Sequence, residues 1–167
     1  AKMHENGDGV PRDPNKALRC YTKFILAAEE KIGMDPDKDV VLLGAYDPTA
    51  DLCDRAGRYA EAEKTYGRQL GKIILLTMLH GTAFRTYLIS CYEKLGDVIR
   101  RQDRPEEAER LYREQRKEIG LLPDDGDILP MKTHFLVKCL GRLADVNKQL
   151  CNTEEADSLY SEISNIL

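Results

Sequence analysis

A short pattern recurs four times along the chain, and this repetition restricts the fold more than any other feature. In every copy an alanine precedes a tyrosine by four residues, and the pairs are Ala17/Tyr21, Ala62/Tyr66, Ala108/Tyr112 and Ala156/Tyr160. The successive alanines are 45, 46 and 48 residues apart (17 to 62, 62 to 108, 108 to 156). A nearly constant spacing in this range indicates a stack of repeated units, each of them one supersecondary element.

Apolar residues between these copies recur at intervals of three and four, which predicts helices. No segment alternates between apolar and polar residues with a period of two, so we expect no strands. Pro48 interrupts one helical pattern, where it either kinks a helix or starts a new one. Residues 1–13 and 33–39 are rich in turn-forming residues and are predicted to lack helix. The chain should therefore form about seven helices, over residues 14–32, 40–56, 59–78, 82–101, 105–119, 128–150 and 153–167.

Three of these helices are preceded by residues that commonly cap a helix. Asp13 stands directly before Pro14, a pairing typical of a helix start. Asp103 and Asn152 are each followed three residues later by a glutamate, which is the spacing of a capping box. We therefore predict that Asp13, Asp103 and Asn152 are N-caps.

Composition and charge narrow the classes of function. The chain has 167 residues, of which 42% are hydrophobic and 32% charged, enough for a domain with a real core. Its net charge of −4 argues against a dedicated nucleic-acid binder, which needs a basic surface. No apolar run is long enough to span a bilayer. The five cysteines form no CxxC pair, so we expect mainly small buried side chains in a reducing, cytoplasmic compartment.

The repeated motif resembles the tetratricopeptide repeat, in which a small residue pair lies about twelve residues before the alanine. Leu95-Gly96 precedes Ala108 in this way, Leu143-Ala144 precedes Ala156, and Thr49-Ala50 is a weaker copy before Ala62. The opening segment, residues 6–23, resembles the related Sel-one-like repeat, although Cys20 stands where that repeat has an aromatic residue. The usual tetratricopeptide repeat is shorter, so the helices or loops here must be longer.

The resemblance implies an all-α, right-handed α-solenoid of antiparallel helix pairs. It predicts one domain over residues 1–167, made of a partial repeat at 1–33 and repeats at about 39–78, 81–119 and 128–167. In this family the first helix of each pair lines a concave groove that binds an extended peptide or a partner's helix. The positions that would line it here are Asp47, Asp51, Asp54, Arg55, Glu93, Asp97, Arg100, Arg101, Asp145 and Lys148.

The expected function is a non-catalytic scaffold that binds a protein or peptide. An aspartate recurs eleven residues before each of the last three alanines, as Asp51, Asp97 and Asp145, which favours a partner with a basic segment. The alternative is that these charges are solvated helix faces with local ion pairs. His4 and His80 have no ligand spacing, and neither has His134, so we predict no catalytic site, cofactor or metal.

Two other functions stay open. One is a sensory or regulatory module of a larger protein whose groove holds a ligand or peptide. The other is self-assembly as a homodimer through the C-terminal helix, which ends in Leu159, Ile163, Ile166 and Leu167 and is followed by no polar cap.

Overall fold

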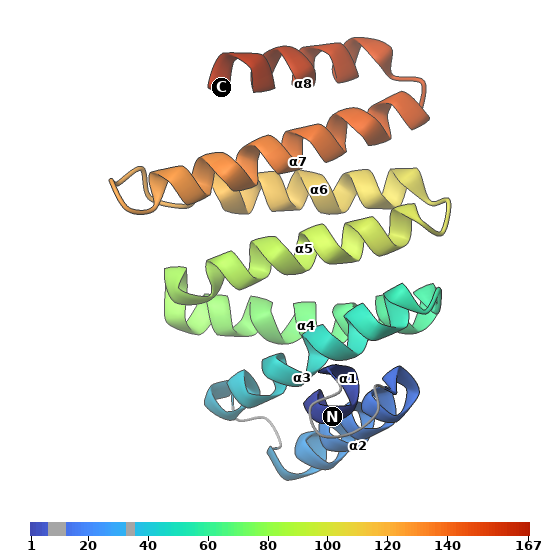
Figure 1. Cartoon of the computed structure of the whole chain (residues 1–167). Coiled ribbons are helices and arrows are strands. Elements are labelled where there is room, and N and C mark those ends of the chain that lie inside the picture. The colour runs from blue at the N-terminus through green and yellow to red at the C-terminus, as the bar shows by residue number, and fades with distance from the viewer. Residues whose placement is uncertain (7–12, 33–35) are drawn as a thin grey trace. The chain divides into compact units, whose positions relative to one another are not determined.

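The computed structural model describes residues 1–6, 13–32 and 36–167, and in these residues the chain is all-α with no strand. Figure 1 shows the helices in chain order. Besides one short N-terminal helix there are seven long ones, which confirms the predicted all-α fold. The helices are α1 (Lys2–Asn6), α2 (Pro14–Ile32), α3 (Pro36–Arg55), α4 (Tyr59–His80), η1 (Gly81–Phe84, a 3-10 helix), α5 (Arg85–Arg100), α6 (Pro105–Gly120), α7 (Leu129–Gln149) and α8 (Thr153–Ile166).

Three predicted boundaries need correction. Helix α3 begins at Pro36, inside the segment expected to be a loop, because proline is well tolerated in a first helical turn. A short helix, α1, occupies Lys2–Asn6, where we expected turns. The helix expected from Thr82 begins as the 3-10 turn η1 and becomes α-helical only at Arg85. The remainder of the two predicted loops, residues 7–12 and 33–35, lies outside the described residues.

Helix α3 continues through Pro48 as one element, so no second helix starts there. Proline lacks a backbone N–H and therefore leaves one helical acceptor without its usual donor. The hydroxyl of Thr49, the next residue, donates to the carbonyl of Ala45 at 2.6 Å. This adds a side-chain bond to the same turn, but the carbonyl that Pro48 leaves without its helical donor is that of Gly44.

The chain packs as two compact units, Ala1–Leu76 and Thr77–Leu167, and we describe each by itself. Unit 1 holds α1, α2, α3 and most of α4. Unit 2 holds η1 and α5 to α8, in which α5 packs against α6, α6 against α7, and α7 against α8. Figure 1 shows the helices of unit 2 as antiparallel hairpins, from green α5 to red α8. The single domain expected over residues 1–167 stays a prediction.

The repeated alanines and tyrosines lie in the cores of these units. Ala17, Ala62, Ala108 and Ala156 are fully buried, and Tyr21, Tyr66 and Tyr112 are buried beside them. Tyr160, in the last helix, is half-buried. The small pairs one helix earlier behave as expected, because Leu95, Gly96 and Ala144 are buried. A Cβ added to Gly96 would lie 2.5 Å from Cε1 of Tyr112, so only glycine fits this close contact as it stands.

Three helix corners share one backbone conformation, which replaces the capping boxes predicted at Asp103 and Asn152. Gly57, Asp103 and Cys151 have φ values of 72°, 59° and 62°, and each lies five residues before a repeated alanine. Neither α6 nor α8 has a side-chain cap hydrogen bond, so both predicted capping boxes are wrong. Asn152 does occupy the N-cap position of α8, as predicted, whereas the N-cap of α6 is Arg104 and not Asp103. The left-handed residue itself turns the chain and ends the preceding helix. The prediction for Asp13 is confirmed, since its Oδ1 accepts from Lys16 N at 2.9 Å.

Candidate protein-binding surface

The recurring aspartates bind the recurring tyrosines. In each repeat the tyrosine hydroxyl donates to the aspartate fifteen residues earlier: Tyr66 to Asp51, Tyr112 to Asp97 at 2.7 Å, and Tyr160 to Asp145 at 3.0 Å. Burial, and after it the hydrogen bond and charge of the nearby aspartate, raises the pKa of both Tyr66 and Tyr112. These hydroxyls therefore stay protonated and remain donors. The repetition of the aspartate thus has a structural cause within each helix pair.

A second hydrogen bond repeats in the first two of these pairs. The Nε2 atom of Gln69 donates to Asp47 at 3.0 Å, and that of Gln115 donates to Glu93 at 3.3 Å. Both glutamines are buried, and both bonds span 22 residues. Buried amides need such partners. The last pair lacks this bond, because Gly141 and Ile163 occupy the corresponding positions.

Arg142 on α7 joins two of the predicted residues on α5. Its Nη2 lies 2.7 Å from Oε1 of Glu93, and its Nε lies 2.9 Å from Oδ1 of Asp97. All three side chains are about one-fifth exposed, at 21%, 17% and 20%. Sequence reasoning missed Arg142. It lies three residues before Asp145 and six before Lys148, so its helical spacing could have placed it on the same face of α7.

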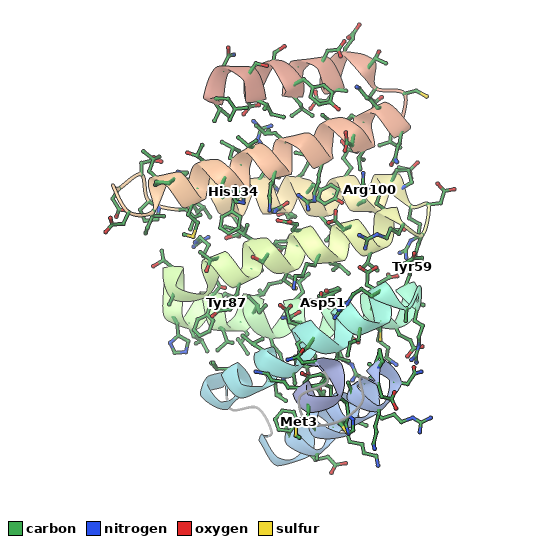
Figure 2. All side chains as sticks on the ribbon, viewed as in Figure 1. Met3, Asp51, Tyr59, Tyr87, Arg100 and His134 are labelled. Carbon is green, nitrogen blue, oxygen red and sulfur yellow. The ribbon has the colours of Figure 1, made fainter. Side chains whose placement is uncertain are left out.

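Apart from Arg101, the predicted charges of unit 2 lie on α5 and α7, and we call them, with Arg142, the α5/α7 face. Arg100 Nη1 lies 3.8 Å from Oδ2 of Asp145, whose side chain is 53% exposed. The Lys148 ammonium lies 4.5 Å from the ring centroid of Tyr160, a cation–π contact. Figure 2 shows Arg100 towards the end of α5. The α5/α7 face comprises Glu93, Asp97, Arg100, Arg142, Asp145 and Lys148.

The other predicted binding residues lie on α3 of unit 1 or directly after α5. Asp47, Asp51 and Asp54 are half-buried on α3 of unit 1, where Figure 2 marks Asp51, and their charges act on the hydroxyl of Tyr66. Arg55 is exposed and donates to the backbone oxygen of Asp51 at 3.2 Å. Arg101, at the end of α5, is exposed. Their roles in binding stay predictions.

Unit 1 carries a hollow of about 720 Å³ between α2 and α4, with Thr49 and Cys53 of α3 also among its lining residues. Its walls carry five basic side chains and one acidic one: Arg19, Lys23, Arg58, Lys64, Arg68 and Glu61. Sequence analysis did not find this hollow, because the basic residues come from two helices about forty residues apart. We call it the basic hollow.

The burial of the cysteines determines how reactive they can be as nucleophiles. Cys53, Cys91 and Cys139 are buried, whereas Cys20 and Cys151 are exposed, so burial was predicted correctly for three of the five. Burial raises the pKa of Cys139 to about 12, which makes it a poor nucleophile near neutral pH. Within the described residues, no group of three or more His, Cys, Asp or Glu could hold a metal ion.

Helix α8 carries the apolar residues of the predicted homodimer contact. Leu159 is buried, Ile163 and Ile166 are half-buried, and Leu167 is 89% exposed; a homodimer through α8 stays a prediction.

The helical stretch Tyr59–Arg100 contains a window with a mean hydropathy of 1.3, of which 28% is buried. By length and composition it could cross a membrane, but the core helix of a water-soluble protein passes the same test, so this is weak evidence.

Comparison with known proteins shows the fold alone. No protein-family model matches the chain, and no curated protein matches it. Fourteen chains of solved structures match, among them the crystal structure of BtubC (BKLC) from P. vanneervenii. That match has a TM-score of 0.64 and 20% sequence identity, and it covers 92% of this chain. The chain corresponds to 56% of the length of the BtubC chain.

Proposed function

We propose that the chain is a non-catalytic scaffold of the tetratricopeptide-like type that binds a partner protein or peptide on the α5/α7 face. The observation that carries this proposal is that the first helices of two successive repeats present charged side chains side by side, and that Asp145 and Lys148 are exposed among them. Such a surface, built on packed helices, can position polar contacts to a partner.

The charges of the α5/α7 face refine the partner that we expect. Its three acidic residues, Glu93, Asp97 and Asp145, are balanced by Arg100, Arg142 and Lys148. Arg142 already occupies the position beside Glu93 and Asp97 that a partner's basic side chain would take. A basic residue of the partner is therefore best accommodated at Asp145, and an acidic one at Lys148.

The proposal is tested by exchanging the two exposed charges in Asp145→Lys/Lys148→Glu, which leaves the net charge unchanged. Wild type and variant would be used to capture partners from a lysate, and a captured protein would then be titrated by calorimetry. We expect the variant to lose that partner. The control is Glu114→Lys/Lys117→Glu, which exchanges an exposed ion pair of 2.6 Å on α6.

Equal capture by all three proteins would refute the α5/α7 face as the binding site. Because Asp145 also accepts from Tyr160, thermal melts by circular dichroism must show that the variant stays folded. A variant that melts early would be replaced by Lys148→Glu alone, because Lys148 is exposed and its ammonium lies 4.5 Å from the centroid of the Tyr160 ring.

A further inference from the structure

We propose that the basic hollow of unit 1 binds an acidic peptide segment of a partner. This site lies on α2 and α4 and uses none of the residues of the α5/α7 face, so it goes beyond the function proposed above. The proposal rests on charge, on a comparison with the other repeats, and on the shape of the hollow.

Three of its basic side chains lack a charged partner. Arg58, which directly precedes α4, is paired with Glu61, with Nε 2.7 Å from Oε1, and Arg68 of α4 lies 3.7 Å from Glu29 of α2. Arg19, Lys23 and Lys64 are exposed, and among the described residues none of them forms an ion pair or a side-chain hydrogen bond. Unpaired positive charge is thus concentrated in one hollow of a chain whose net charge is −4.

The corresponding helices of unit 2, α6 and α8, are joined by two ion pairs at other positions of the repeat. Arg113 and Arg116 of α6, five and eight residues after Ala108, reach α8. Arg113 lies 3.5 Å from Glu155, and Arg116 lies 2.8 Å from Glu162. These acids stand one residue before and six residues after Ala156.

The same positions in unit 1 cannot make these bonds. Five and eight residues after Ala17 stand Thr22 and Ile25 on α2, so both arginines are absent. On α4, the second acid is replaced by Arg68, six residues after Ala62. In unit 1 the two helices are instead joined by one longer ion pair, Arg68 to Glu29 at 3.7 Å. The basic side chains of Arg19, Lys23 and Lys64 line the rest of the groove. An acidic ligand would supply the missing negative charges.

The shape of the hollow suits an extended segment. Its lining on α2 runs from Asn15 to Leu26, which is about 16 Å along a helix. A stretch of about five extended residues covers that length. Leu26 is 50% exposed at one end, so the segment that fits combines Asp or Glu residues with an apolar side chain. Among the described residues, no aromatic side chain lines the hollow, which disfavours nucleic acid, because bases stack on aromatic rings.

The test is the binding of a fluorescent synthetic peptide made of Asp and Glu with one Leu at an end, followed by anisotropy on the whole chain. The variant Arg19→Glu/Lys23→Glu/Lys64→Glu should bind the peptide at least about tenfold more weakly than wild type. The control, Arg110→Glu/Lys117→Glu/Lys138→Glu, carries the same net charge on exposed positions of α6 and α7. We expect its affinity to stay within about twofold of wild type.

Three results would overturn the proposal: no saturable binding by wild type, an equal loss in both variants, or a single-stranded oligonucleotide bound as tightly as the peptide and displaced by it. If the charge reversal unfolds the chain, Arg19→Gln/Lys23→Gln/Lys64→Gln replaces it, with the same expected loss. The α5/α7 exchange variant should bind the peptide as wild type does, so failure at either site can be told from failure at the other.

Discussion

Gly96 shows how strongly one position can depend on a residue of the neighbouring helix. The ring of Tyr112 fills the space where a Cβ of Gly96 would lie, and the hydroxyl of the same ring is held by Asp97. Twelve residues before Ala62 and Ala156 stand Ala50 and Ala144, both fully buried. In those repeats the pair of helices accommodates a methyl group, whereas the contact of α5 with α6 does not.

We predict that Gly96→Ala destabilises the fold by about 1–2 kcal/mol, because the ring must shift and strain outweighs the gain in helix propensity. Gly141→Ala is the matched control, since a Cβ there meets nothing within 4 Å. That variant should gain up to about 1 kcal/mol. Urea unfolding curves of both variants and wild type measure the difference. Equal gains for both would show that the ring of Tyr112 moves freely.

The sequence was sufficient to find the Ala–Tyr pairs and their small partners, because both depend on spacing along the chain. It could not reveal the role of Asp51 or Asp97. Each lies fifteen residues before its tyrosine and on a different helix, so the bond appears only once the two helices are antiparallel. From spacing alone, an aspartate that is hydrogen-bonded within the fold cannot be distinguished from one that is available to bind a partner protein.

At the scale of helices, the last three helix pairs share the backbone conformation of the corner between their two helices. Gly57 adopts the left-handed conformation without cost, whereas Cys151 has the same conformation with a side chain. After Gly57, Arg58 N donates to Cys53 O at 2.8 Å; after Cys151, Asn152 N donates to Asn147 O at 2.8 Å. Capping boxes were predicted at two of these corners, because a capping box is recognised by residue types at fixed offsets in the sequence. A left-handed backbone angle at a residue other than glycine leaves no comparable pattern in the sequence.

Cys151→Gly should stabilise the chain by about 1 kcal/mol, because it relieves the left-handed strain and Cys151 is exposed, so little packing is lost. Gly57→Ala should destabilise it by a similar amount at the equivalent corner. Thermal melts followed by circular dichroism would measure both shifts. A lower midpoint for Cys151→Gly would show that the thiol makes a contact that outweighs the strain.

At the scale of the whole molecule, the chain consists of two compact units, and Arg142 ties together the helices of the second. It bridges α7 to two acids of α5, so it joins two successive repeats of unit 2. The seven long helices could be predicted from the sequence, whereas the short helices α1 and η1 could not. The division at residues 76 and 77 could not, because it falls inside α4, which shows no break in its helical pattern.

We predict that Arg142→Met weakens unit 2 by about 1–3 kcal/mol, because it leaves two partly buried carboxylates side by side without a cation. Hydrogen exchange should show lost protection in α5 to α8 and unchanged protection in α2 and α3. The control is Arg116→Met, whose ion pair with Glu162 is more exposed, and its cost should stay below about 1 kcal/mol. A loss spread evenly over both units would contradict this assignment.

The bridge made by Arg142 has a consequence for how such a chain can change by duplication or deletion. Glu93 and Asp97 belong to one copy of the motif, yet the cation that neutralises them belongs to the next. A deletion of the entire last copy would therefore leave Glu93 and Asp97 of the preceding copy without the cation that neutralises them. The segment that contains both acids and the arginine that neutralises them is longer than one repeat. The copies therefore depend on their order along the chain and cannot be exchanged freely.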